Sequence, residues 1–369
     1  MKVALMGRSL RGRFSGVVRY THELVTALAP RLGTDLSVFV TRAEDGIGGL
    51  GIRRVRAPFP TPNEYARAAW EQSIVPLQVA RLGADVFHSP NYILPLALRC
   101  PAVVTVHDLF YLDPSLHRLR SHLYLSALSS LAIGKARRII CVSAYTRDRL
   151  LQHHPNAEAK VRVVGEGVDA RFVPPSAEAV SATRERLGLA GPYVLFVGTV
   201  EPRKNLDRLV RAFSAAVLRS GLPHQLVIAG GAGWRAAPFR AALNASPVRD
   251  RIRVLGYVAE EDMPALYGGA DLFVFPSLEE GFGLPPLEAM ACGTAVVTSC
   301  TSALPEVVGD AAALVDPLDE GALSSTIEGL LGSGRRRRAL AQAGPAQAAR
   351  FSWERVADQT LAVYAEAAA

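Results

Sequence analysis

The sequence predicts an α/β fold with two doubly wound parallel sheets, one in each half of the chain. Short apolar runs alternate with helical patterns from end to end, which is typical of parallel sheets covered by helices. The chain of 369 residues is longer than one hydrophobic core usually supports. Pro174 and Pro175 interrupt the alternation near its middle, as a linker does. We therefore predict one domain over residues 1–173 and a second over residues 174–351.

In the first domain, the residues of interest follow the predicted strands. The strands cover residues 3–6, 36–40, 86–88, 102–107, 138–142 and 161–164. Helical patterns separate them at residues 17–32, 70–82, 123–134 and 146–152. Ligands of such sheets bind at the carboxyl ends of the strands. The loop that ends at Gly16 and the strand end at His107 are therefore candidate sites, although a lone histidine is also compatible with simple packing.

The second domain repeats this alternation, and its first loop carries two cations. Its strands are predicted at residues 193–197, 225–229, 253–255, 272–275, 295–298 and 313–315. Arg203 and Lys204 stand just before a predicted helix at residues 206–219. Charge combined with free backbone N–H groups at a helix start suits a diphosphate, while a solvated loop pair is the alternative. A last helix is expected to begin after Ser352 as its N-cap.

The loop after the strand at residues 272–275 has the features of a ligand-binding turn. Gly281 and Gly283 would let backbone N–H groups approach a ligand closely. The two prolines that follow favour a helix start, and a helix N-terminus favours anions. Glu280 precedes the loop and Glu288 lies inside the helix, so the two carboxylates could meet opposite ends of one ligand. The alternative is an ordinary loop with two solvated glutamates.

The distribution of charge and the cysteine content limit which partners and which cellular compartment are expected. Residues 1–173 hold 23 Lys and Arg against 13 Asp and Glu, whereas residues 174–369 hold 18 against 21. The basic half would attract an anionic acceptor or an anionic membrane surface. The alternative is that its arginines are simply solvated. The candidate residues for contact with an anionic surface are Arg53, Arg54, Arg56, Arg118 and Arg120. No signal peptide or membrane span is expected, and the four cysteines lack metal-ligand spacing. We expect a cytoplasmic protein, at most peripheral at the inner face of the plasma membrane.

The stretch from Glu280 to Glu288 resembles the Glu-x7-Glu signature of retaining GT-B glycosyltransferases of family four. The resemblance covers essentially the whole chain, including the segment at residues 165–169, where Glu166 stands in place of a common Asn. It implies two Rossmann-like domains that face a cleft. It also implies that the C-terminal helix, residues 352–369, returns to the first domain.

The resemblance implies a role for each candidate residue. Glu280 would contact the donor sugar, together with the backbone N–H groups of Phe282, Gly283 and Leu284. Glu288 would bind the ribose, and Arg203 with Lys204 the donor phosphates. The resemblance also implies donor contacts of Gly16 with the phosphates, of His107 with the sugar, and of Tyr257 and Val258 with the base. Gly230, directly after the strand at residues 225–229, is a further implied donor contact.

The implied reaction is transfer of a hexosyl group from a nucleotide-sugar to a glycan or lipid-linked acceptor. No Asp-x-Asp pair occurs, so we expect no metal; Arg203 and Lys204 would stabilise the leaving diphosphate. The expected catalytic residues are therefore Arg203, Lys204, His107 and Glu280. Several loops look most like those of mannosyltransferases of bacterial surface polysaccharide assembly. This favours GDP-mannose as donor, with a UDP-sugar as the alternative.

Two other classes of function stay open at this point. A sugar-nucleotide epimerase or a glycosyl phosphorylase has a similar architecture. An epimerase would use the donor as its only substrate, and a phosphorylase would need a pyridoxal lysine, for which only Lys204 is well placed. A non-enzymatic protein that binds through its basic half is the third reading. We do not expect nucleic acid as a partner, because basic residues with interleaved aromatics are not seen and Glu280 and Glu288 would repel phosphate.

Overall fold

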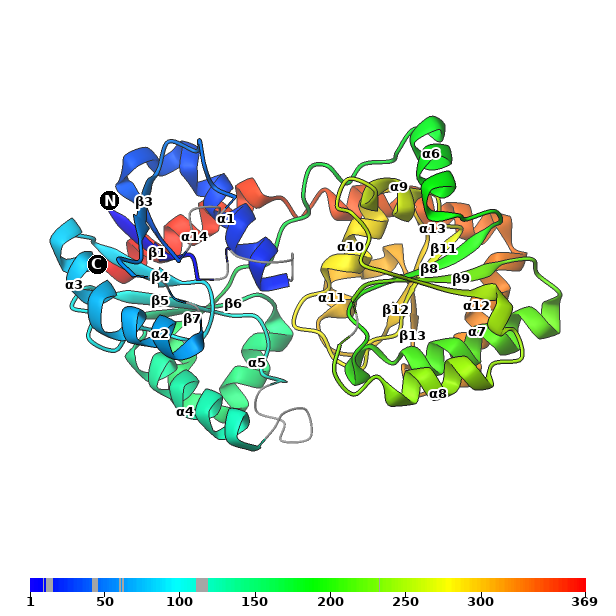
Figure 1. Cartoon of the computed structure of the whole chain (residues 1–369), viewed down its shortest axis with the longest axis horizontal. Helices are drawn as coiled ribbons and strands as arrows, with labels where there is room; N and C mark the ends of the chain where they lie inside the picture. The colour runs from blue at the N-terminus through cyan, green and yellow to red at the C-terminus, as the bar shows by residue number, and fades with distance from the viewer. Residues whose placement is uncertain are drawn as a thin grey trace. The chain divides into compact units, whose positions relative to one another are not determined.

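The structure is a computed structural model that describes residues 1–8, 10, 16–41, 46–59, 61, 63–110, 119–231 and 233–369. These residues form two compact units (Figure 1). The first comprises Met1–Gly167 with Trp353–Ala369, and the second comprises Val168–Ser352. The boundary lies a few residues before the predicted one. The backbone explains this, since the N–H of Val168 donates to the carbonyl of Phe351 and the chain pairs with Ser352.

The first unit is built on one parallel sheet in the order β3-β2-β1-β4-β5-β6-β7. The strands are β1 (Val3–Met6), β2 (Leu36–Val40), β3 (Arg53–Arg56), β4 (Val86–Ser89), β5 (Ala102–Val106), β6 (Arg138–Cys141) and β7 (Val161–Val163). The helices are α1 (Gly16–Leu32), α2 (Glu64–Ala69), α3 (Val75–Leu82), α4 (Leu119–Lys135), α5 (Ala144–His153) and α14 (Trp353–Ala368). Helix α14, red in Figure 1, packs on α1 and on strands β4, β5 and β6.

Two features of this unit differ from the sequence prediction. Strand β3 was not predicted, because its residues, Arg53 to Arg56, lack the apolar character of a buried strand. It lies at the edge of the sheet, where arginines can face water. The single helix predicted over residues 70–82 is instead a π-helical turn, Trp70–Ile74, followed by α3. The π-helical turn buries Trp70 and α3 buries Val75 and Val79, so apolar residues run through both and the sequence pattern does not distinguish them.

The second unit has a parallel sheet in the order β10-β9-β8-β11-β12-β13. The strands are β8 (Tyr193–Val197), β9 (Gln225–Ala229), β10 (Ile252–Gly256), β11 (Leu272–Phe275), β12 (Val296–Ser299) and β13 (Ala313–Val315). The helices are α6 (Ala177–Leu187), α7 (Leu206–Ser220), α8 (Ala237–Ala245), α9 (Met263–Gly268), α10 (Leu284–Ala291), α11 (Leu304–Val308), α12 (Glu320–Gly332) and α13 (Gly334–Ala348). The central strands are buried throughout, which requires helices on both faces of the sheet.

The predicted fold class, two doubly wound parallel sheets, is confirmed by the two sheets. Both expose loops at the carboxyl ends of their strands, and these loops carry the candidate residues. Within the described residues, no helix has both the length and the apolar character that crossing a membrane requires.

Candidate active site

The two loops with the strongest sequence signals meet in the second unit. Strands β8 and β11 are neighbours, so the loops that leave their carboxyl ends lie side by side. The N–H of Leu278 donates to the carbonyl of Arg203 at 2.7 Å, and the side-chain amide of Asn205 donates to the carbonyl of Pro276 at 3.0 Å. These bonds hold the residues before α7 against the residues before α10.

One carboxylate organises the charges at this junction. Glu280 accepts from the ammonium of Lys204 at 2.6 Å and from the guanidinium of Arg203 at 2.7 Å. The hydroxyl of Ser277 donates to the same carboxylate. We call these four residues the Glu280 cluster. Glu280 is 8% exposed and Lys204 is 6% exposed, so the ion pair is shielded from water.

The carboxylate of Glu280 is ionised at neutral pH. Burial by itself would raise the pKa of Glu280, but the adjacent charges of Arg203 and Lys204 outweigh it and lower the pKa to about 2. Burial lowers the pKa of the Lys204 ammonium, and the charge of Glu280 opposes this shift. The ammonium also lies 4.7 Å from the centre of the Phe275 ring, a favourable cation–π distance.

The sequence predicted Arg203 and Lys204 as phosphate ligands but not their pairing with Glu280. Arg203 also bonds Glu201 at 3.1 Å, so two carboxylates and two cations meet here. Arg203 also donates to the carbonyl of Glu279 at 3.4 Å, and the Lys204 ammonium has three N–H donors, more than its bond to Glu280 uses. The arrangement can therefore present oriented positive groups to an anion while a buried carboxylate keeps them in place.

Glu288 lies in the second turn of α10 and is buried. Its carboxylate accepts from the hydroxyl of Tyr267 at 2.7 Å. Tyr267 belongs to α9, and no motif in the sequence pointed to it. The tyrosine fixes the orientation of the carboxylate. The predicted contact of Glu288 with ribose stays a prediction.

The turn between Glu280 and Glu288 depends on glycine. Gly283 has a φ of 123°, and a Cβ there would lie 2.8 Å from a side-chain carbon of Leu304. Phe282 packs edge-on against Phe351, with ring centres 5.8 Å apart, and Leu284 is the first residue of α10. The backbone contacts of these residues with a donor stay predictions.

The loops after β9 and β10 carry the other predicted donor contacts. A Cβ at Gly230 would lie 2.0 Å from the carbonyl oxygen of Gly198, so the close approach of two loops requires glycine there. Tyr257 is 46% exposed, whereas Val258 is buried. The packing of the two loops therefore explains why glycine is needed at position 230, whether or not a ligand binds there. The contacts of Gly230, Tyr257 and Val258 with a donor stay predictions.

Two predicted residues lie in the first unit. Gly16 is exposed and is the first residue of α1, while most of the loop before it (Ser9 and residues 11–15) lies outside the described residues. His107 directly follows β5 and is buried. Its Nδ1 lies 2.9 Å from a carboxylate oxygen of Glu166, and its Nε2 lies 3.0 Å from the carbonyl oxygen of Pro90. Both partners accept hydrogen bonds, so both ring nitrogens carry a proton.

The carboxylate of Glu166 favours the charged form of His107. Burial alone would lower the pKa of His107, but the hydrogen bond and charge of Glu166 outweigh it and raise the pKa. The sequence did not reveal this contact, because the residues lie 59 positions apart. Both ring nitrogens are engaged within the first unit, so the predicted contact of His107 with a sugar stays a prediction.

A second buried histidine ties the C-terminal helix to the sheet. His88 shares hydrogen bonds with the hydroxyl of Tyr364 at 2.6 Å and with the hydroxyl of Thr105 at 2.9 Å. Burial, and to a smaller extent the charge of His107, lower the pKa of His88 to about 3, so this ring is neutral. The sequence predicted the strand at residues 86–88 but not this connection of His88 to α14.

We predict that replacing Glu166 by Gln lowers the pKa of His107 below its ordinary value of 6.5, because burial then acts with less opposition. NMR titration of the histidine ring signals measures the pKa of His107. The His107 signals are assigned as those that disappear in a His107→Gln variant. The exposed Glu158→Gln change is the control. In the wild type, the raised pKa of His107 means that its pairing with Glu166 stabilises the folded state fully below pH 6.5. This stabilisation is lost as the pH rises through the pKa that His107 has in the folded protein. An unchanged His107 titration in Glu166→Gln would contradict the assignment.

The described residues contain no group of three or more His, Cys, Asp or Glu side chains placed to hold a metal ion. The metal-free chemistry expected from the sequence stays a prediction. The positive groups on which it would depend are those of the Glu280 cluster.

Comparisons with known proteins identify the family and the fold. The family described as Glycosyl transferases group 1 matches residues 181–347, and Glycosyltransferase Family 4 matches residues 14–172. O-antigen chain mannosyltransferase B of Escherichia coli is 34% identical over 76% of this chain and 74% of its own length. Serotype-specific mannosyltransferase WbdA of Escherichia coli is 28% identical over 79% of this chain, but the match spans only 38% of that protein. HepE of Anabaena, solved with UDP and glucose, is 21% identical over 98% of both chains, with a TM-score of 0.78.

Proposed function

The chain belongs to the family 4 glycosyltransferases, and from this we propose that it moves a mannosyl group from GDP-mannose to a glycan or lipid-linked acceptor in polysaccharide or glycoconjugate synthesis. Its two Rossmann-like units have the GT-B fold, and the chain is a glycosyltransferase that uses a nucleotide-sugar donor. Mannose is supported by the similarity to O-antigen chain mannosyltransferase B. A UDP-sugar is the second candidate, because HepE was solved with UDP and glucose.

The Glu280 cluster is the observation that carries the proposal. Breaking a glycosyl phosphate bond leaves negative charge on the departing diphosphate. Arg203 and Lys204 would stabilise this charge from fixed positions, which costs little reorganisation during the reaction. Glu280 would hold both cations in place near the N-terminus of α10, while the backbone N–H groups of the turn after Glu280 bind the sugar.

Retention of configuration would follow if the acceptor attacks from the face that the diphosphate leaves. The leaving phosphate oxygen then takes the acceptor proton, so no separate base is required. Glu288 would bind the ribose and so place the diphosphate at the Glu280 cluster. The positively charged His107 of the first unit would serve the sugar end of the donor.

A panel of nucleotide-sugars tests the donor. The full chain is incubated with GDP-mannose, UDP-glucose and related donors, and release of nucleoside diphosphate and thermal stabilisation are scored. We expect GDP-mannose to be turned over fastest, and turnover to survive excess chelator because Arg203 and Lys204 supply the positive charge. Faster turnover of a UDP-sugar would contradict the proposed donor. Complete loss on chelation, restored by Mn²⁺ or Mg²⁺, would contradict the metal-free mechanism. Conversion of the donor to its epimer would reveal the epimerase alternative.

We also propose that the basic first unit attracts an anionic membrane or lipid-linked acceptor, which would place the cytoplasmic enzyme at the inner face of the membrane. Arg53, Arg54 and Arg56 are exposed on the edge strand β3. Arg118 and the side chain of Arg120, which the sequence also suggested, lie outside the described residues.

We predict that the wild-type chain sediments with anionic vesicles at low salt but not with neutral ones. Each basic residue near an anionic surface contributes about 1 kcal/mol, so changing Arg53, Arg54 and Arg56 together to Gln should weaken binding by roughly a hundredfold. The matched control changes Arg335, Arg336 and Arg338, exposed residues of α13, to Gln. Equal sedimentation of both triple variants, or none by the wild type, would refute the role of β3.

A further inference from the structure

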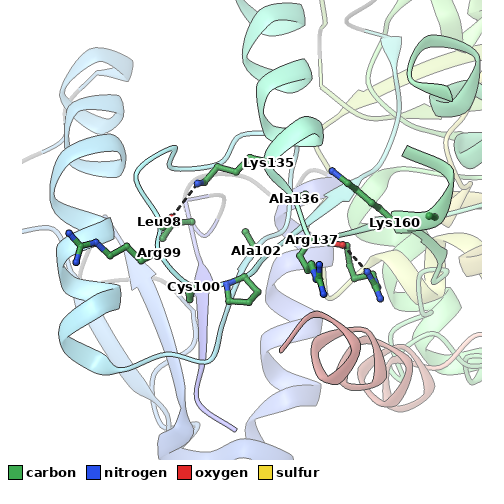
Figure 2. Close-up of a pocket in the computed structure, with 11 residues that line it drawn as sticks. Leu98, Arg99, Cys100, Ala102, Lys135, Ala136, Arg137 and Lys160 are labelled. Carbon is green, nitrogen blue, oxygen red and sulfur yellow. Dashed lines mark hydrogen bonds between the residues drawn. The ribbon is translucent and has the colours of Figure 1, made fainter. Parts of the chain in front are cut away.

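A pocket lies at the end of the first sheet opposite to His107 (Figure 2). Its volume is about 670 Å³. Its walls are the residues that lead into three adjacent strands, with Ala102 at the start of β5, Arg138 at the start of β6 and Lys160 just before β7. His107 follows the other end of β5, so a strand of roughly 16 Å separates the pocket from that residue. The pocket is therefore not part of the candidate active site.

The lining is strongly basic. Five of its side chains are cations and none is a carboxylate, the cations being Arg99, Lys135, Arg137, Arg138 and Lys160. They come from different segments, since Arg99 precedes β5, Lys135 ends α4 and Lys160 ends the 3₁₀ turn Pro155–Lys160. Figure 2 shows Arg99, Lys135, Arg137 and Lys160 on the separate segments that line the pocket. Two of the four lysines of the chain are thus gathered at one pocket.

Little in the described structure neutralises these charges. Lys135 donates to the carbonyl of Leu98 at 3.2 Å, and Lys160 donates to the carbonyl of Gly134 at 2.8 Å. Carbonyl groups orient an ammonium but carry no net charge. Arg138 pairs with Glu366 of α14 at 3.0 Å. The side chains of Arg99 and Arg137 form no hydrogen bond or ion pair with any residue that the structure describes.

Some other exposed arginines of the protein pair with carboxylates, while Arg249, Arg251 and Arg253 donate to carbonyl groups. Arg31 bonds Asp358 at 2.7 Å, and Arg211 bonds Glu320 at 2.7 Å. Like charges gathered around a hollow repel one another, and a bound anion removes this repulsion. The thiol of Cys100, which also lines the pocket, adds no negative charge at neutral pH because burial raises its pKa.

We propose that this pocket binds a phosphate group, carried either by a soluble phosphate ester or by the headgroup of an anionic lipid. A phosphate monoester has up to two negative charges and three unesterified oxygens, and the phosphodiester of a lipid headgroup has one charge and two such oxygens; both offer acceptors to several cations. The forked guanidinium groups of Arg99 and Arg137 can each donate two hydrogen bonds to it. Lys135 and Lys160 keep donors beyond those used by the carbonyls, since an ammonium has three.

Calorimetry with glycerol 3-phosphate tests the soluble source. The titration uses the full chain with saturating nucleoside diphosphate, so that the Glu280 cluster is occupied and does not contribute. We expect the Arg99→Gln/Arg137→Gln variant to bind at least tenfold more weakly than the wild type. The control, Arg335→Gln/Arg336→Gln, removes the same charge from exposed positions of α13 and should bind like the wild type.

Sedimentation with phosphatidylglycerol and phosphatidylcholine vesicles tests the lipid source with the same variants. If the ligand is a headgroup, the pocket variant should lose at least fivefold in binding to phosphatidylglycerol vesicles while the control does not. A loss confined to glycerol 3-phosphate identifies a soluble ligand, and a loss confined to vesicles identifies a lipid. If the pocket variant matches the control in both assays, or if the wild type binds neither probe, the proposal is wrong.

Discussion

Replacing Lys204 by Met is expected to destabilise the second unit by about 3–5 kcal/mol, because it leaves the carboxylate of Glu280 buried with one cation fewer. The two charges are 2.6 Å apart and almost fully shielded from water. Burial favours the neutral form of Glu280, and it is the two cations that keep its pKa low. Urea unfolding, followed by circular dichroism, measures the loss.

The double variant Lys204→Met/Glu280→Gln separates pairing from packing. It removes both charges, so it should be less destabilised than the sum of the two single variants. Arg211→Met is the control, because that residue pairs with Glu320 at the surface, where an ion pair contributes at most about 1 kcal/mol. Strict additivity of the two single changes would show that the pair is not coupled.

Replacing Glu280 by Gln is expected to lower the rate of transfer by about 10²–10³-fold while nucleoside diphosphate still binds nearly normally. In the proposed mechanism, the carboxylate holds Arg203 and Lys204 where charge develops on the leaving group. A neutral amide still accepts hydrogen bonds but no longer anchors the cations by charge. The amide oxygen can still accept hydrogen bonds from the two cations, so both should stay near enough to bind the product diphosphate, which lacks the sugar; its binding should therefore change little.

Glu288→Gln should show the opposite pattern. Losing a charged hydrogen bond to ribose costs roughly 1.5–3 kcal/mol, which weakens nucleoside diphosphate binding about ten- to hundredfold. Steady-state kinetics and calorimetry of both variants, with the exposed Glu261→Gln as control, distinguish the roles. Unfolding curves would identify any loss that comes from instability. If Glu280→Gln weakens diphosphate binding and Glu288→Gln does not, the division of labour is the reverse of the one proposed.

The strands of both sheets were predictable because their signal is local. Runs such as Leu272–Phe275 are apolar at every position, as a strand buried on both faces must be. Strand β3 escaped prediction for the opposite reason, since an edge strand with exposed arginines needs no apolar pattern. The loops at the strand ends could be located in the same way, because strand order and direction place them at one edge of a sheet.

The sequence by itself determined the element order, the glycine-rich turn before α10, and the residue types that could meet a sugar-nucleotide. Tertiary structure alone decided which charges meet. Lys204 and Glu280 are 76 positions apart, and His107 and Glu166 are 59 apart. Neighbouring strands β8 and β11 bring Lys204 and Glu280 together, whereas His107 follows β5 and Glu166 comes after β7, with β6 between the two strands. In each pair the partner's charge outweighs burial, which lowers the pKa of Glu280 and raises that of His107. Pairing of this kind depends on distance and dielectric in three dimensions, and neither quantity is written in the local pattern of residues.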